Sequence, residues 1–303
     1  MKKTIFGFAT LMSAVVLAAC GGGGTDTSGN NSGGNSNNKE ELTFPIATKN
    51  NDDAIEDGEL EAAVATDSQF KGLFQWEFYQ DSYDAAFMAP SHEPLFANDD
   101  DFRITDDGAA TLDLDEDTKK ATIKVKDNVK WSDGEDVTAD DVIFPYEIIG
   151  NKDYTGIRYD DTFRNIVGME EYHDGSADTI SGIKKIDDKT VEIEYKEVNP
   201  SMLQSGGGIW TYAAPKHTLE GVAIKDMESS DQVRKNPVTF GPYYMSNIVA
   251  GESVEYLPNE HYWNGTPKLK KITMKSVPMA SATEALNSKL YDMIFQMPTD
   301  TYD

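Results

Sequence analysis

Residues 129–142 read VKWSDGEDVTADDV, a strand-like stretch that runs into a helix-like one. Val129 and Trp131 alternate with lysine in the pattern of a half-buried strand. The Ser-Asp-Gly that follows has the composition of a tight turn. Thr138 then precedes an acid-rich first turn, which is typical of a helix N-cap because carboxylates suit the positive end of the helix dipole. The stretch therefore predicts a strand, a turn and a helix that Pro145 kinks or ends early.

Short strand and helix patterns lie on both sides of this unit. The predicted elements are strands at residues 42–47, 121–131, 246–258, 269–277 and 291–296, a hairpin at 182–195 and a helix at 280–289. Residues 59–70 mix helix formers with small residues and leave the type of element open. This mixture predicts an α/β fold of mixed α+β character, in which the sheets are mixed rather than purely parallel.

The composition of the chain excludes one class of function. The 303 residues include 53 acidic and 27 basic ones, a formal charge of −26. Such a surface argues against nucleic-acid binding, which needs cations to displace counterions from phosphates. Hydrophobic residues make up 39 %, enough for a packed core. The single cysteine excludes an internal disulfide.

The N-terminus has the pattern of an export signal. Lys2 and Lys3 precede a short apolar run at residues 5–19, which ends in Leu-Ala-Ala directly before Cys20. This run resembles the lipobox of bacterial lipoproteins, in which the cysteine is lipidated and becomes the new N-terminus; the alternative is an ordinary signal with a chance cysteine. Residues 21–38 are mostly Gly, Ser and Asn, a flexible tether. We expect a lipid-anchored protein on the outer face of the bacterial cytoplasmic membrane.

No pattern of catalytic or metal-binding residues is found in the sequence. The histidines stand far apart, without the His-Glu-x-x-His spacing of a zinc site, at positions 92, 173, 217 and 261. No Gly-x-Ser-x-Gly elbow occurs. The glycine triplet at residues 206–208 is followed by Ile-Trp rather than by Lys-Ser/Thr, so it is not a phosphate loop. We therefore expect a binding protein that has no metal or cofactor and is not an enzyme.

Three stretches carry a resemblance to a known family. They are residues 129–142, residues 236–243 (NPVTFGPY) and residues 258–267 (PNEHYWNGTP). Together they resemble the solute-binding proteins of peptide importers, the bacterial extracellular solute-binding proteins of family 5, and among these the oligopeptide-binding lipoproteins of ABC importers. The resemblance spans roughly residues 42–303. We interpret the motifs themselves as fold markers rather than as ligand contacts.

The resemblance implies a periplasmic-binding-protein-like clamp, of the class with an extra accessory domain. Such a protein captures oligopeptides in a cleft between two lobes and delivers them to permease subunits in the membrane, while ATP is hydrolysed elsewhere in the complex. It is expected to act as a monomer. The alternatives are a binder of a sugar or of a signalling peptide on the same fold, or a surface adhesin.

The resemblance also implies a division of the chain. The expected parts are a signal peptide (1–19), the lipidated cysteine and linker (20–39), the first part of one lobe (40–89), an accessory domain (90–214), the second part of that lobe (215–296) and the start of the crossover to a second lobe (297–303). That second lobe is expected to be missing from this chain. We therefore expect a damaged clamp, and the truncated form to be non-functional if the missing lobe is indispensable.

Seven residues are candidate ligand contacts on the strength of this resemblance. They are Trp76, Tyr79 and Gln80 in the aromatic stretch, Gly208, Trp210 and Tyr212 at the exit of the accessory domain, and Phe295 near the interlobe crossing. The alternative for each is ordinary packing in the core or in a loop, because aromatic clusters occur more often in cores than on ligand platforms.

Overall fold

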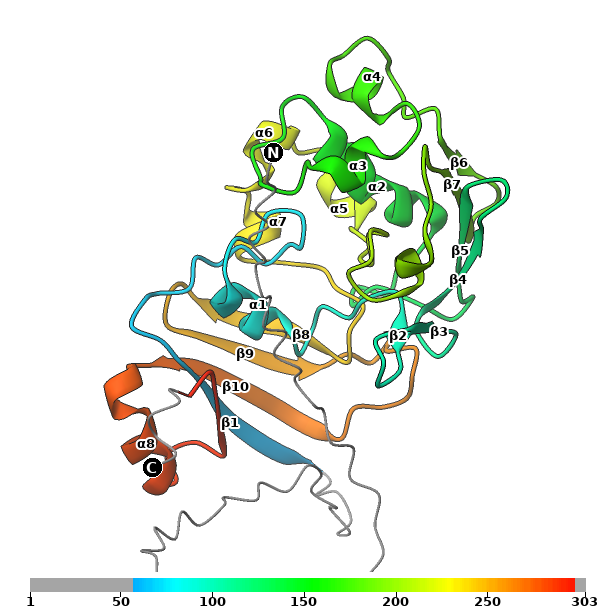
Figure 1. Ribbon diagram of the computed structural model, residues 1–303. Coiled ribbons are helices and arrows are strands. Elements are labelled where there is room, and N and C mark those ends of the chain that lie inside the picture. Colours follow the sequence, from blue (N-terminus) through cyan, green and yellow to red (C-terminus); the bar gives the residue numbers. More distant parts are fainter. Residues whose placement is uncertain (1–56, 298–303) are drawn as a thin grey trace, which may run out of the picture. The chain divides into compact units, whose positions relative to one another are not determined.

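The computed structural model describes residues 57–297 (Figure 1). These residues all belong to one structural unit of the chain, residues 52–303. Several predictions lie outside the described residues: the signal segment 1–19, Cys20 with its linker to residue 39, the strand at 42–47, and the crossover predicted at 297–303 except for its first residue. Within residues 57–297, no helix is both long enough and apolar enough to cross a membrane.

Short elements make up the described part of the chain. The strands are β1 (Gly58–Ala65), β2 (Ala97–Asn98), β3 (Ile104–Thr105), β4 (Ala110–Asp115), β5 (Lys120–Val125), β6 (Ile183–Lys185), β7 (Thr190–Glu194), β8 (Tyr243–Val249), β9 (Ser253–Pro258), β10 (Leu269–Val277) and β11 (Met293–Phe295). The helices are α1 (Ser82–Met88), α2 (Ala139–Gly150), α3 (Asp161–Arg164), α4 (Met169–His173), the 3₁₀ helix η1 (Pro200–Leu203), α5 (Lys216–Leu219), α6 (Ile224–Met227), α7 (Asp231–Arg234) and α8 (Met279–Asn287).

One sheet is antiparallel and has the strand order β4-β5-β7-β6. Along β5, Ala121, Ile123 and Val125 are fully buried, whereas Lys124 between them is exposed. This period of two lets one face of the sheet pack into the larger hydrophobic core, to which Tyr146 of α2 also belongs. The predicted hairpin that ends at Tyr195 is confirmed as β6 and β7.

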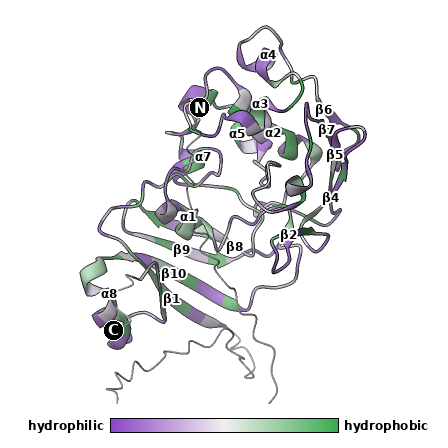
Figure 2. Cartoon of the chain, viewed as in Figure 1, coloured by the Kyte–Doolittle hydropathy of each residue, from purple (hydrophilic) through white to green (hydrophobic). Residues whose placement is uncertain are grey.

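The second sheet is mixed and has the strand order β11-β1-β10-β9-β8. β1 pairs in parallel with β10 and with β11, while β10, β9 and β8 pair antiparallel. Strand β1, from the start of the described chain, lies beside β10 from its end (Figure 1). Hydrophobic and hydrophilic segments follow one another along these strands in Figure 2. The predicted mixed α/β class is therefore confirmed.

The unit at residues 129–142 differs from its prediction in two details. The strand predicted over 121–131 ends at Val125, and the chain then forms a narrow loop closed by a bridge between Lys130 and Asp136. Helix α2 also continues for five residues beyond Pro145. Two core clusters receive side chains from α2, and this burial offsets the hydrogen bond that a proline inside a helix removes.

Asp141 is a buried carboxylate, 4 % exposed, in the first turn of α2. Its Oδ2 accepts hydrogen bonds from the backbone N–H (2.8 Å) and the hydroxyl (2.9 Å) of Thr138, which is the N-cap residue, as predicted. Its Oδ1 accepts from the N–H of Lys216 (2.9 Å), and its carbonyl accepts from the N–H of Ala214 (3.0 Å). One residue therefore caps the helix and ties it to the chain at 214–216.

The variant Asp141→Ala tests this role. It removes three hydrogen bonds to a buried carboxylate, and we expect the free energy of unfolding to fall by ~2–4 kcal/mol, as measured by urea denaturation. The neighbouring Asp140→Ala is the matched control, since Asp140 forms an exposed ion pair with Lys185 (2.8 Å) that is worth at most ~1 kcal/mol. Equal losses in the two variants would contradict the assignment.

Candidate functional site

A pocket with a volume of about 360 Å³ lies beside α2. Its walls are Tyr146 of α2, parts of residues 158–166 including α3, and parts of residues 205–212. Gly206 and Gly208 in the last wall have φ of +80° and +118°, a backbone conformation that favours glycine. Pockets of roughly 300–1,000 Å³ are of the size that holds small ligands.

Aromatic side chains from distant parts of the chain meet at this pocket. Trp76 stacks on Tyr212, with ring centroids 4.1 Å apart and planes 17° apart, and meets Tyr79 edge-on at 5.0 Å. Trp210 contacts both Tyr212 and Phe163, each at 5.8 Å between centroids. The rings therefore form one continuous cluster of tilted and stacked pairs, an arrangement that aromatic rings favour.

Five of the seven candidate contacts lie in or against this cluster. Gly208, Trp210 and Tyr212 line the pocket itself. Trp76 and Tyr79 do not line it, but Trp76 contacts Tyr212 and Tyr79 contacts the pocket residue Arg158. Their part in ligand binding stays a prediction.

The other two candidates lie elsewhere. Gln80 is exposed, and its Oε1 accepts a hydrogen bond from Lys71 Nζ at 3.1 Å. Phe295 belongs to β11, the outermost strand of the mixed sheet, and is 37 % exposed. Neither residue lines the pocket, so the structure does not bring them together with the other five.

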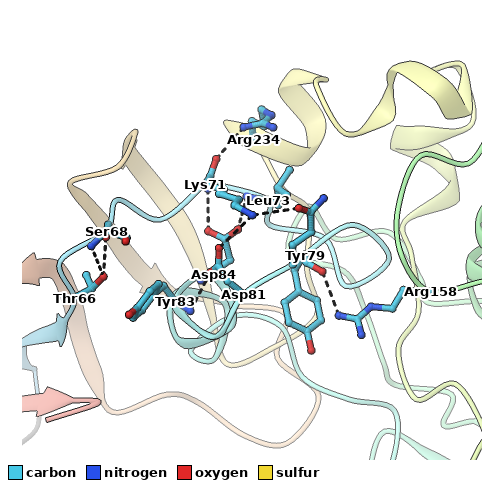
Figure 3. Close-up of polar contacts among 12 residues, drawn as sticks. Thr66, Ser68, Lys71, Leu73, Tyr79, Asp81, Tyr83, Asp84, Arg158 and Arg234 are labelled. Carbon is cyan, nitrogen blue, oxygen red and sulfur yellow. Dashed lines mark hydrogen bonds and ion pairs between the residues drawn. The ribbon is translucent and has the colours of Figure 1, made fainter. Parts of the chain in front are cut away.

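The loop that carries Trp76 and Tyr79 is anchored by the buried carboxylate of Asp84 (Figure 3). Asp84 Oδ1 accepts from the N–H of Gly72 at 2.9 Å, and Oδ2 accepts from the N–H of Leu73 at 3.3 Å. Burial raises the pKa of Asp84, and these backbone hydrogen bonds act against that rise. The same helix that supplies Asp84, α1, thus fixes where the aromatic loop begins.

Glu77 is a fully buried carboxyl group inside the aromatic stretch. Its Oε2 accepts a hydrogen bond from Gln75 Nε2 at 2.6 Å, and its carbonyl accepts one from the Tyr154 hydroxyl. Its Oε1 has no hydrogen-bond partner among the described residues. Because burial removes water from the carboxylate, the pKa of Glu77 rises to about 7.

Sequence reasoning missed four residues of the site. Tyr146, Phe163 and Arg158 lie outside the three motif stretches and outside the aromatic stretch that supplied candidate contacts. Glu77 did carry a signal, since an acidic residue flanked by aromatic ones is either buried with them or marks an exposed aromatic surface. The stretch alone does not distinguish these two cases.

The variant Glu77→Gln tests the buried carboxyl group through the pH dependence of stability. The pKa of Glu77 is raised from an ordinary value of 4.5 to about 7 in the folded protein, so the folded state binds a proton more tightly than the unfolded state does. The resulting contribution to stability is fully present below pH 4.5 and is lost as the pH rises through 7. Glutamine does not titrate, so the variant should not lose this stability. We therefore expect the difference in free energy of unfolding, variant minus wild type, to be larger at pH 8 than at pH 4.5 by ~3 kcal/mol. Glu171→Gln, at an exposed position, is the control. The same pH dependence in all three proteins would contradict the assignment.

A comparison with known sequences identifies the family to which the chain belongs. The family model described as bacterial extracellular solute-binding proteins, family 5 Middle, matches residues 103–303. The oligopeptide-binding protein OppA of Lactococcus lactis subsp. lactis is 38 % identical over 265 residues, which are 86 % of this chain and 44 % of the relative. This chain therefore spans less than half the length of the curated relative.

Solved structures agree with the fold. The match to lactococcal OppA, complexed with an endogenous peptide in the closed conformation, covers 81 % of this chain and 47 % of the OppA chain, at 39 % identity and a TM-score of 0.78. The match to AppA of Bacillus subtilis in complex with a nonapeptide covers 82 % of this chain and 45 % of AppA, at 23 % identity and a TM-score of 0.66. At this identity the match shows a likeness of fold alone. The predicted periplasmic-binding-protein-like fold is thereby confirmed. With the family model matched over most of its length, this chain belongs to family 5 of the bacterial extracellular solute-binding proteins.

Proposed function

We propose that this chain is the substrate-binding component of an ABC importer, which captures oligopeptides outside the cytoplasm and delivers them to a membrane permease. The observation that carries the proposal is the likeness to lactococcal OppA, a protein whose solved structure holds a peptide, at 39 % identity and a TM-score of 0.78. The family is one of solute-binding proteins, so the activity proposed is binding rather than catalysis.

The pocket has the chemistry that a peptide binder needs. Its aromatic walls offer apolar surface to side chains of varied shape, and water can fill the space that a smaller side chain leaves. Ser205, Thr162 and Thr211 add hydroxyl groups to the lining, which can donate to or accept from a peptide backbone. Trp76, Tyr79, Gly208, Trp210 and Tyr212 are the proposed contacts.

We also propose how the chain is divided and anchored. One lobe is formed by residues 40–89 and 215–296, and an accessory domain is formed by residues 90–214. The sheets support this division, because the five-stranded sheet contains only β1 and β8 to β11 and the four-stranded sheet contains only β4 to β7. Cys20 carries the lipid that holds the monomeric protein at the outer face of the membrane, which the lipobox-like sequence before it supports.

Nuclear magnetic resonance of residues 20–303 tests the proposed binding. The chain has four tryptophans, and their indole N–H signals report on separate places: Trp210 lines the pocket, whereas Trp263 does not. We expect a millimolar pool of short peptides to shift the Trp210 signal and to leave the Trp263 signal in place. A shift with maltose but not with peptides would favour the sugar-binding alternative and contradict the proposal.

The variant Trp210→Ala tests the pocket itself. Removing a half-buried aromatic wall should weaken peptide binding by roughly tenfold, as measured by calorimetry, because a contact surface of ~1.5 kcal/mol or more is lost. Trp263→Ala is the control, since Trp263 is also half-buried but packs under Lys126 outside the pocket. Unchanged affinity in Trp210→Ala, with thermal unfolding showing that both variants are folded, would contradict the assignment.

A further inference from the structure

The pocket is lined by two charged side chains, Arg158 and Asp160. Asp160 is engaged by the fold, because its Oδ1 caps α3 by accepting from the N–H of Thr162 (2.9 Å) and of Phe163 (3.4 Å). Arg158 forms no ion pair with any acidic side chain of residues 57–297. Arg234 is the other half-buried arginine of residues 57–297 that forms no ion pair, but its guanidinium donates to two backbone carbonyls and it does not line the pocket.

The guanidinium of Arg158 is nevertheless held in place. It lies over the ring of Tyr79, with Cζ 4.2 Å from the centroid, and its Nη2 donates to the Tyr79 carbonyl at 3.2 Å (Figure 3). Its backbone N–H donates to the Tyr154 hydroxyl at 3.3 Å. Its Nε is buried and has no acceptor within the described residues. Stacking thus fixes the plane of the group and leaves N–H donors without partners.

The buried carboxyl group of Glu77 lies close enough to Arg158 for the positive charge to act against the rise of the Glu77 pKa, but the two side chains are not within ion-pair distance. No ion pair joins the two side chains, and the carboxyl group of Glu77 is bound by Gln75 instead. Burial raises the pKa of Glu77 to about 7, which disfavours the charged form that would pair with Arg158. The positive charge of Arg158 therefore remains available at the pocket.

We propose that Arg158 is a specificity-determining residue of this pocket, where it binds a carboxylate of the ligand while the aromatic walls pack against the apolar part next to it. An unpaired, pre-oriented guanidinium is the side chain best suited to a planar carboxylate, because two parallel N–H groups match its two oxygens. The inference rests on the proposed function and adds that the captured peptides carry their acidic group beside an aromatic or aliphatic residue.

Two small probes of the same shape test the inference on the pocket alone. N-acetyl-L-phenylalanine and its amide differ only in carboxylate against carboxamide, and we expect the acid to bind at least about tenfold more tightly by chemical-shift titration. Arg158→Gln should remove this preference, and Arg158→Lys should restore only part of it, since lysine keeps the charge but not the paired N–H groups. Lys152→Gln, in the same loop but outside the pocket, is the matched control and should keep the full preference.

Two peptides of equal length then distinguish the sources of the carboxylate. One carries an internal Phe-Glu and an amidated C-terminus, and the other carries Phe-Gln and a free C-terminus. Tighter binding of the first assigns Arg158 to an acidic side chain, and tighter binding of the second assigns it to the C-terminus; in both cases Arg158→Gln should cancel the difference.

Other results would overturn the inference. Equal binding of the acid and amide forms, with peptides still bound, would contradict the carboxylate site and leave the proposed function standing. The same conclusion follows if Arg158→Gln keeps the preference for the acid while thermal unfolding shows that the variant is folded. If neither the probes nor any peptide binds, both proposals fail.

Discussion

The carboxylate of Asp141 holds together the parts of the chain that build the site. It closes the first turn of α2 on Thr138 and accepts the backbone N–H of Lys216, so the helix and the chain leaving the pocket share one buried anchor. Burying a charge without partners is costly, and here the backbone supplies them. The position of Tyr146, one turn further along α2, and that of residues 205–212 both depend on this link.

The aromatic cluster lies beside two buried polar groups that lack hydrogen-bond partners. Glu77 has a carboxyl oxygen without a partner, and Arg158 has a buried Nε in the same condition. Buried polar atoms of this kind are rare in stable cores, since each costs free energy. Other atoms of this kind, such as Trp131 Nε1 and Thr273 Oγ1, belong to residues that do not line the pocket, so the proposal of a ligand site depends on the lining of the pocket and not on these atoms alone.

Much of the local structure follows from the sequence. The cap at Thr138, the hairpin of β6 and β7, and the strands β9 and β10 stand where periodicity and turn residues placed them. Strand β1 did not, because its Glu and Ala residues favour helix in isolation. It becomes a strand because β10 and β11 pair with it on both sides, and no local window contains that information. The site divides in the same way, since Trp76, Trp210 and Tyr212 were foreseen but Arg158 was not.

The sequence by itself determined the mixed α/β class, the family, and which aromatic stretches were candidates for the site. These follow from short-range order: alternation, capping, turns and motifs that lie within a few residues of one another. Only the tertiary structure decided that Trp76 stacks on Tyr212, that Gln80 and Phe295 lie away from the pocket, and that Arg158 is unpaired. The physical reason is that burial and charge pairing arise between segments far apart in the sequence, such as Tyr79 and Arg158, whose approach is fixed by packing of the whole chain rather than by local preference.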